Sequence, residues 1–117
     1  MPSYSVLVTA ATLWAPLAAA HAVLKASNPA PGAVLASAPA ELALTFNENI
    51  EPPFSKVTVL AADGRNAAPG KATVDGANPA LVRLTLPALA ASEYTVKWAV
   101  AGRDGHRRTG EFKFTVK

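Results

Sequence analysis

Two histidines and one aspartate are the residues in this chain whose types and spacing could hold a metal ion. His21 follows a run of three alanines, and cleavage of the chain directly before it would leave a free α-amine and an imidazole on one residue. The amine nitrogen and Nδ1 of such a residue can close a chelate ring on a single metal. Asp104 and His106 lie two positions apart in an extended or turning segment, so both side chains can point to the same side.

Together these groups supply three nitrogens and one oxygen, which is a donor set that tetragonal Cu(II) prefers. Ni(II) is less favoured by the stability order, and Zn(II) could use the same atoms in a tetrahedron, so the geometry of the site has to decide between the metals. The chain has no cysteine and a single methionine, Met1, which excludes thiolate ligands and a thioether site for Cu(I). Because the amine and the imidazoles must lose protons to bind, the metal affinity should fall steeply on acidification.

The start of the chain has the composition of an export signal. Residues 1–20 carry no Lys, Arg, Asp, Glu or His, and residues 6–20 are nearly all apolar or small and end in alanines. Signal peptidase requires such small residues, so we expect a signal peptide over 1–20 and a mature domain over 21–117. A retained membrane anchor is the alternative, although a span needs about 20 strongly apolar residues. Cleavage after Ala22 would also satisfy the small-residue rule and would discard His21.

The rest of the chain is broken every eight to twelve residues by Pro, Gly or Asn-Pro clusters, which leaves no room for helices of ordinary length. Between the breaks, apolar and polar residues alternate, as in strands with one buried face. The alternation predicts an all-β, immunoglobulin-like Greek-key sandwich of about seven strands, with an open barrel as the alternative and with Trp98 and the phenylalanines in the core. The expected strands are 22–26, 41–46, 56–60, 72–74, 81–86, 94–100 and 111–116, with 30–40 as a connection.

The charge balance argues against nucleic acid as a partner. Eleven Lys and Arg face eight Asp and Glu, for a net charge of +3, and the basic residues form no run interleaved with aromatic residues. Arg103, Arg107 and Arg108 nevertheless surround the Asp104 to His106 segment. Charged residues are usually solvated, so a solvated loop is the simplest interpretation, while pairing with nearby carboxylates or with an acidic partner stays open.

The order of motifs along the mature chain also points to a family. A His-Ala start precedes a Pro-Xaa-Xaa-Gly turn, a strand ending in Phe-Asn-Glu, an aromatic strand, an Asp-Xaa-His turn and a Gly-Xaa-Phe-Xaa-Phe-Xaa-Val terminus. In this order, the chain resembles the periplasmic copper-binding proteins of the CopC type over essentially all of residues 21–117. The matching segments are His21-Ala22, Pro29-Ala30-Pro31-Gly32, Phe46-Asn47-Glu48, Phe54-Ser55, Tyr94-Thr95-Val96-Lys97-Trp98, Asp104-Gly105-His106 and Gly110-Glu111-Phe112-Lys113-Phe114-Thr115-Val116.

The resemblance implies one Cu(II) ion held by His21, Asp104 and His106, with the N-terminal amine as fourth donor and cleavage before His21. Glu48 corresponds to a carboxylate near the site that supports the ligands, although an exposed carboxylate at a strand end is an equal alternative. The implied function is copper resistance, homeostasis or delivery in the periplasm, without catalysis and without stable membrane insertion. An inner-membrane copper transport protein is the implied partner. Some family members carry a Met-rich loop for Cu(I), which this sequence lacks, and Arg107 stands where proline often follows the histidine.

Two other functions remain as alternatives. A histidine with its terminal amine plus a second histidine is also the copper brace of polysaccharide monooxygenases, which are enzymes. Asp104 could fill the open position that such an enzyme needs, and residues 21–117 contain one Trp and one Tyr for stacking on a glycan. The second alternative is a metal-free, immunoglobulin-like interaction module, which would show no tight copper affinity.

Overall fold

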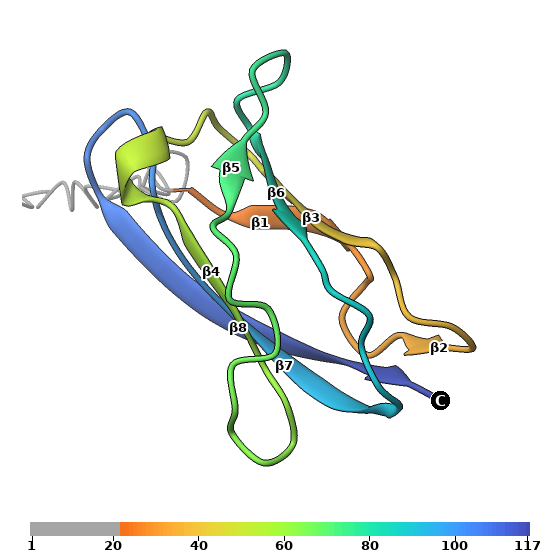
Figure 1. The fold of residues 1–117 in the computed structure, drawn as a ribbon. Coiled ribbons are helices and arrows are strands. Elements are labelled where there is room, and N and C mark those ends of the chain that lie inside the picture. Colours follow the sequence, from red (N-terminus) through yellow and green to blue (C-terminus); the bar gives the residue numbers. More distant parts are fainter. Residues whose placement is uncertain (1–21) are drawn as a thin grey trace, which may run out of the picture.

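Residues 22–117 are described by a computed structural model, in which eight strands form two four-stranded sheets (Figure 1). The predicted all-β sandwich is confirmed. In spatial order, the first sheet consists of β1 (Leu24–Asn28), β3 (Glu41–Phe46), β6 (Leu81–Thr85) and β5 (Thr73–Val74), and the second consists of β2 (Val34–Leu35), β8 (Arg107–Val116), β7 (Ser92–Ala101) and β4 (Lys56–Leu60).

The core lies between the sheets and is built from the alternate positions of each strand. In β3, Leu42, Leu44 and Phe46 are buried while the residues between them are less so, which is the two-residue period of a pleated strand. Among the described residues, no polar or charged residue is fully buried. Burial of apolar side chains, at about 25 cal/mol per Å² of apolar surface, is therefore the main term that holds together a domain without disulfides.

One phenylalanine departs from the predicted core. Phe46, Phe112 and Phe114 are buried, and Trp98 packs against the core, but Phe54 is 51% exposed. Phe54 closes a short 3-10 helix, η2 (Pro52–Phe54), which precedes β4 and contributes no buried residue. Phe54 therefore lies outside the alternating pattern of β4 and outside the core.

The sequence missed one strand. β2 lies within the segment expected to be a connection and pairs in parallel with the end of β8. Two residues are too few for an alternation pattern, so β2 depends on its partner: Thr115 donates its backbone N–H to Ala33, and Lys117 donates to Leu35. This parallel pair is an addition to an otherwise antiparallel sandwich.

The hairpin of β7 and β8 is longer than the hydrophobic pattern indicates. β8 begins at Arg107 rather than at residue 111, because Arg107 to Gly110 continue the ladder opposite Ala101 to Trp98. The turn that joins the two strands spans 102–106. It lies at the same end of the molecule as η2 and the start of β1 (Figure 1).

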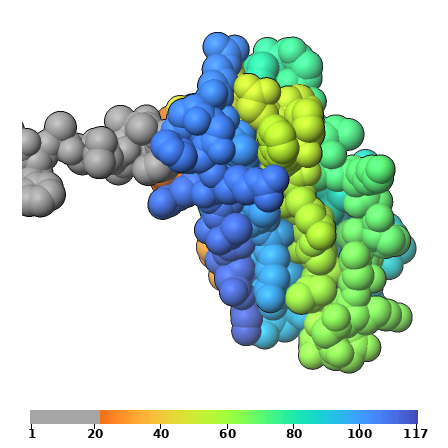
Figure 2. Space-filling view, turned by 90° about the vertical axis from the view of Figure 1, so that its left-hand side faces the viewer, coloured from red at the N-terminus to blue at the C-terminus, as the bar shows by residue number. Residues whose placement is uncertain are grey.

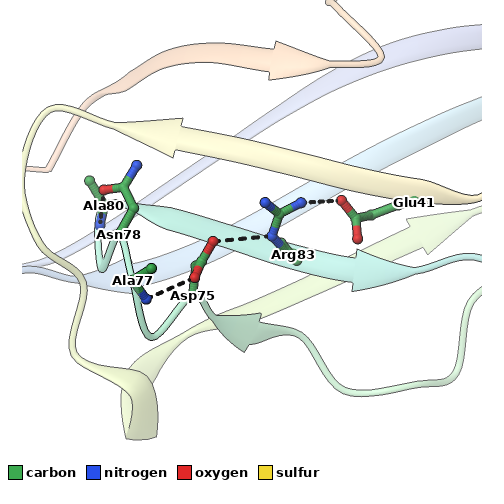
Figure 3. A network of polar contacts seen from close by, with 6 residues as sticks. All are labelled: Glu41, Asp75, Ala77, Asn78, Ala80 and Arg83. Atoms are coloured by element: carbon green, nitrogen blue, oxygen red, sulfur yellow. Dashed lines mark hydrogen bonds and ion pairs between the residues drawn. The ribbon is translucent and has the colours of Figure 1, made fainter.

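A network of polar side chains links neighbouring strands on the outer face of the first sheet. Arg83 on β6 forms an ion pair with Glu41 on β3, and its Nε lies 3.4 Å from Oδ2 of Asp75, which follows β5 (Figure 3). Asp75 also accepts the backbone N–H of Ala77 at 2.9 Å. The network thus links two strands and the turn between β5 and β6.

None of the helical segments in the described part of the chain has the length and apolarity that a membrane span requires.

Candidate metal site

Asp104 and His106 come together in the turn between β7 and β8. Oδ1 of Asp104 accepts the backbone N–H of His106 at 3.0 Å, and Oδ2 lies 3.0 Å from Nδ1 of the same histidine. Gly105 between them has φ +79°, a left-handed conformation that glycine adopts without steric cost. The two candidate ligands therefore lie on one side of the turn, as their spacing predicts.

The contact between the two side chains orients the imidazole ring of His106. An ionised carboxylate can only accept a hydrogen bond, so in this contact Nδ1 of His106 is the donor. The side chain of His106 is 62% exposed and that of Asp104 is 29% exposed. An incoming metal could thus reach a carboxylate oxygen and an imidazole nitrogen at one surface.

Glu48 lies directly beside this turn. Its Oε1 is buried and has no hydrogen-bond partner among the described residues, and a Cβ built at Gly102 would lie 1.5 Å from it. Burying a carboxylate oxygen without a partner is costly, so this atom is unusual among the polar groups of the described residues. The sequence left open that Glu48 is an exposed carboxylate at a strand end, but this oxygen is buried.

Asn47 is a functional candidate that the sequence analysis did not single out. Its Oδ1 accepts the backbone N–H of Val23 at 2.7 Å, and its own backbone N–H donates to the carbonyl of Val23 at 3.0 Å. Ala22, the first described residue, is 1% exposed. Asn47 and Val23 are 24 positions apart, so no local pattern in the sequence indicates this contact.

The same region is tied to the turn 102–106, which carries Asp104 and His106. Ile50 forms a β-bridge with Gly102, and Glu51 donates its backbone N–H to Ala101 at 2.9 Å. The start of β1, the segment after β3 and the turn 102–106 are consequently neighbours. Ala22, where the described part of the chain begins, therefore lies at this end of the sandwich.

His21, the third predicted ligand, lies outside the described residues, as does the expected signal peptide. Within residues 22–117, no group of three or more His, Asp or Glu side chains could hold a metal ion. The described part of the site is thus the pair of Asp104 and His106. Carboxylate oxygen and imidazole nitrogen fit a cation that takes oxygen and nitrogen ligands, and copper is one such cation.

The three arginines near the turn are exposed, as the sequence predicted. The guanidinium carbon of Arg107 lies 5.4 Å from the centre of the Phe54 ring, within the range of a cation–π interaction. No ion pair of Arg107 is found among the described residues. Its positive charge therefore stays available at the surface next to His106.

The fold and these side chains define a β-sandwich with a candidate oxygen and nitrogen metal site at one end. The chain belongs to the CopC family, because the model of the CopC domain matches residues 24–117. This match spans both sheets and the turn that carries Asp104 and His106.

Known relatives agree with this assignment. The chain is 36% identical over 121 residues to copper resistance protein C of Pseudomonas syringae pv. tomato, covering 98% of this chain and 95% of that protein. It is also 29% identical over 98 residues to the copper transport protein CutJ of Bacillus subtilis; the similarity covers 83% of this chain and 18% of CutJ.

Solved structures agree as well. The crystal structure of CopC from Methylosinus trichosporium OB3b superposes with a TM-score of 0.79 at 30% identity, covering 83% of this chain and 94% of that chain. The structure of PcoC, a methionine-rich copper resistance protein from Escherichia coli, superposes with a TM-score of 0.69 at 31% identity and covers 83% and 99% of the two chains.

Proposed function

We propose that this CopC-family protein binds copper in the periplasm and serves copper resistance, homeostasis or delivery. The observation that carries the proposal is the pair of Asp104 and His106, whose side chains lie 3.0 Å apart on an exposed turn. Relatives named for copper resistance support the choice of copper over other cations.

The proposed cargo is one Cu(II) ion. His21 supplies its amine and Nδ1 after removal of residues 1–20, and Asp104 and His106 complete the ligand set. The hydrogen bonds between Asn47 and Val23 support this assignment, because they hold the start of β1 at the end of the sandwich where Asp104 and His106 lie.

The chain's own donors favour Cu(II) over Cu(I). Beyond Met1, the sequence has no methionine and no cysteine, so soft sulfur ligands are not supplied. This composition contrasts with the relative described as methionine-rich. Glu48 acts beside the site, where its buried carboxylate oxygen contributes negative charge near the cation without needing to bind it directly.

We also propose that the protein turns over no substrate. A copper-brace enzyme that acts on a glycan needs exposed aromatic rings for stacking. Here Tyr94 is 3% exposed, and the Trp98 ring packs edge-on against Phe46 with a centroid distance of 5.2 Å. Tyr94 and Trp98 thus pack within the sandwich, which leaves Phe54 as the large exposed aromatic side chain among residues 22–117.

An inner-membrane copper transport protein is the proposed partner. Support comes from the similarity to a segment covering 18% of the copper transport protein CutJ, where a domain of this kind is part of a longer chain. A CopC domain that is not fused to the transport protein would then have to dock on it to deliver or receive copper.

The test combines N-terminal sequencing of protein purified from the periplasm with a Cu(II) titration followed by paramagnetic resonance. We expect His-Ala at the start of the chain and one equivalent of tetragonal Cu(II) with nitrogen ligands. Extending the mature chain by one residue, or the substitution His106→Ala, should abolish tight binding, whereas Thr109→Ala on the adjoining strand β8 should not. Tight binding by the extended form would contradict the ligand set, and peroxide-driven cleavage of a glycan would favour the enzyme.

A further inference from the structure

A groove with basic and apolar walls lies beside the turn 102–106. It has a volume of about 660 Å³ and is bounded by η2, the start of β4 and the loop that follows β4, with Arg107 at one end. Figure 2 shows η2 and β4 in yellow-green, with the blue C-terminal strands on one side and the green loop on the other. We propose that this groove binds an extended, acidic segment of a partner protein, added as a strand at the edge of β4.

The backbone of β4 is open where the groove lies. β4 is the last strand of its sheet, so its far side faces no other strand among the described residues. Near the C-terminal end of β4, that side is covered by the loop that follows the strand. Ala67 in this loop donates its N–H to the carbonyl of Val59 at 2.7 Å, and Ala61 donates its N–H to the carbonyl of Arg65 at 2.8 Å. By the alternation of an antiparallel ladder, Val57 presents its N–H and carbonyl to the same side. These groups can pair with a segment that lies in the groove.

The charge of the groove selects an acidic occupant. Its charged lining residues are Lys56, Lys71 and Arg107, and no carboxylate lines it. Three cations around one concave surface attract a segment that carries Asp or Glu and repel a basic one. Charge complementarity therefore defines the chemistry of the partner.

Phe54 gives the groove an apolar anchor. Its side chain is 51% exposed and follows two prolines, whose fixed φ angles keep the wall of the groove rigid. The guanidinium of Arg107 lies over its ring at 5.4 Å, so the two side chains form one surface with both apolar and positive character. An apolar side chain next to an acidic one in the partner would match this surface.

The basic residues of the groove could serve two different purposes, and each can be tested. Lysines at a sheet edge can simply prevent pairing between copies of the protein, in which case the groove binds nothing. Alternatively, the cations could attract an anionic membrane surface. A concave groove with unpaired backbone groups fits a peptide strand better than a flat lipid surface, which offers nothing for Val57 to pair with.

The groove adjoins the proposed copper site without depending on it. Arg107 directly follows His106, so a partner seated in the groove would lie next to that ligand. Because the groove is formed by the protein alone, its binding can be measured without metal. A failure of copper binding and a failure of peptide binding would then be separate results.

The experiment is a nuclear magnetic resonance titration of isotope-labelled, metal-free protein purified from the periplasm. The probe is a capped hexapeptide of alternating Glu and Val, and the matched control peptide replaces each Glu with Lys. We expect the Glu peptide to shift the amide signals of Phe54, Val57, Lys71 and Arg107. The Lys peptide should shift none of them.

Variants distinguish binding in the groove from a general effect of the protein's net charge. Lys71→Glu should weaken binding of the Glu peptide about fivefold, and Phe54→Ser should also weaken it. Lys25→Glu makes the same change of net charge on an exposed residue of β1 in the other sheet and should leave the affinity unchanged. Equal weakening by Lys71→Glu and Lys25→Glu would overturn the proposal, as would shifts on another face, equal binding of both peptides, or no binding at all. Binding to phosphatidylglycerol vesicles without binding of the Glu peptide would likewise overturn it in favour of a membrane surface.

Discussion

The carboxylate of Glu48 occupies the space that a side chain on Gly102 would need. A Cβ at Gly102 would lie 1.5 Å from Oε1 and 2.6 Å from the carboxyl carbon of Glu48. The segment after β3 and the turn that carries Asp104 and His106 therefore approach each other more closely than any residue other than glycine allows. This contact places the carboxylate of Glu48 beside the turn that carries the candidate metal ligands.

Adding a methyl group at Gly102 should force these two segments apart. We expect Gly102→Ala to lower the free energy of unfolding by about 1–3 kcal/mol, because a well-packed region must shift to accept the extra atom. For a domain of this size, the melting temperature should fall by roughly 4–8 °C for each kcal/mol. Thermal unfolding followed by circular dichroism measures the effect.

Gly76→Ala is the matched control for this substitution, since a Cβ there would meet nothing within 4 Å. Combining Gly102→Ala with Glu48→Ala should cost less than the sum of the two single changes, because the second substitution removes the atoms that clash. Equal melting temperatures for Gly102→Ala and Gly76→Ala would show that the close approach is not rigid.

Loss of the Asn47 side chain should loosen the start of β1. Asn47→Ala removes the acceptor for the backbone N–H of Val23, a hydrogen bond of 2.7 Å. At about 1 kcal/mol for such a bond, and since the proposed His21 donor lies two residues before Val23, Cu(II) affinity should fall about fivefold. Hydrogen exchange at the Val23 amide should become faster.

Asn78→Ala removes a comparable contact at another turn, where Oδ1 of Asn78 accepts the N–H of Ala80 at 3.3 Å. It should leave both copper affinity and exchange at Val23 unchanged. If exchange at Val23 accelerates while copper affinity stays constant, the hydrogen bond exists but does not position a ligand.

Gly110 should resist substitution because an indole ring covers it. A Cβ there would lie 2.3 Å from Cζ2 of Trp98, whose ring also packs against Phe46. Gly110→Ala should destabilise the protein by about 1–3 kcal/mol and shift the tryptophan fluorescence, since the ring must move toward solvent. Gly70→Ala, with nothing within 4 Å, is the control, and an unchanged emission spectrum in Gly110→Ala would contradict the prediction.

The network on the first sheet should contribute to stability in a pH-dependent way. The hydrogen bond from the Ala77 backbone and the neighbouring Arg83 guanidinium hold the pKa of Asp75 below its ordinary value of 3.8. A carboxylate whose pKa is lowered by folding stabilises the fold above its ordinary pKa, and this contribution disappears as the pH falls through the lowered value. The melting temperature of Asp75→Asn should therefore lie below that of the parent protein at pH 5–7.

The difference between Asp75→Asn and the parent should shrink as the pH is lowered below about 4. Melting curves recorded from pH 2 to pH 7 test this. Glu111→Gln, which neutralises an exposed carboxylate on the other sheet, serves as the comparison. A difference that stays constant across this range would show that the charge of Asp75 is not the source of its effect.

Strands could be predicted from the sequence where apolar and polar residues alternate over five or more positions. The bounds of β3 and β4 match the expected strands at both ends, because each has a clear apolar face between Pro or Gly breaks. β2 and the first residues of β8 have no such pattern and are extended because a neighbouring strand supplies hydrogen bonds. Pairing of this kind depends on the tertiary fold and leaves no local trace in the sequence.

The sequence also predicted one geometric feature of the candidate site and missed others. The spacing of Asp104 and His106 predicted their shared side of the turn, which the structure contains. The contacts of Asn47 with Val23 and of Glu48 with Gly102 join residues far apart along the chain, and no spacing rule reveals them. The exposure of Phe54 also could not be foreseen, since an aromatic residue beside a strand usually belongs to the core.

The ten-residue length of β8 separates the two ends of the sandwich. At about 3.3 Å per residue, the strand carries the chain roughly 30 Å away from the turn that holds His106, to the opposite end of the molecule (Figure 1). A fluorophore or surface tether attached after Lys117 would therefore stand clear of both the turn and the groove. Immobilised or labelled in this way, the protein could serve as a reporter of copper capture and partner docking without steric interference.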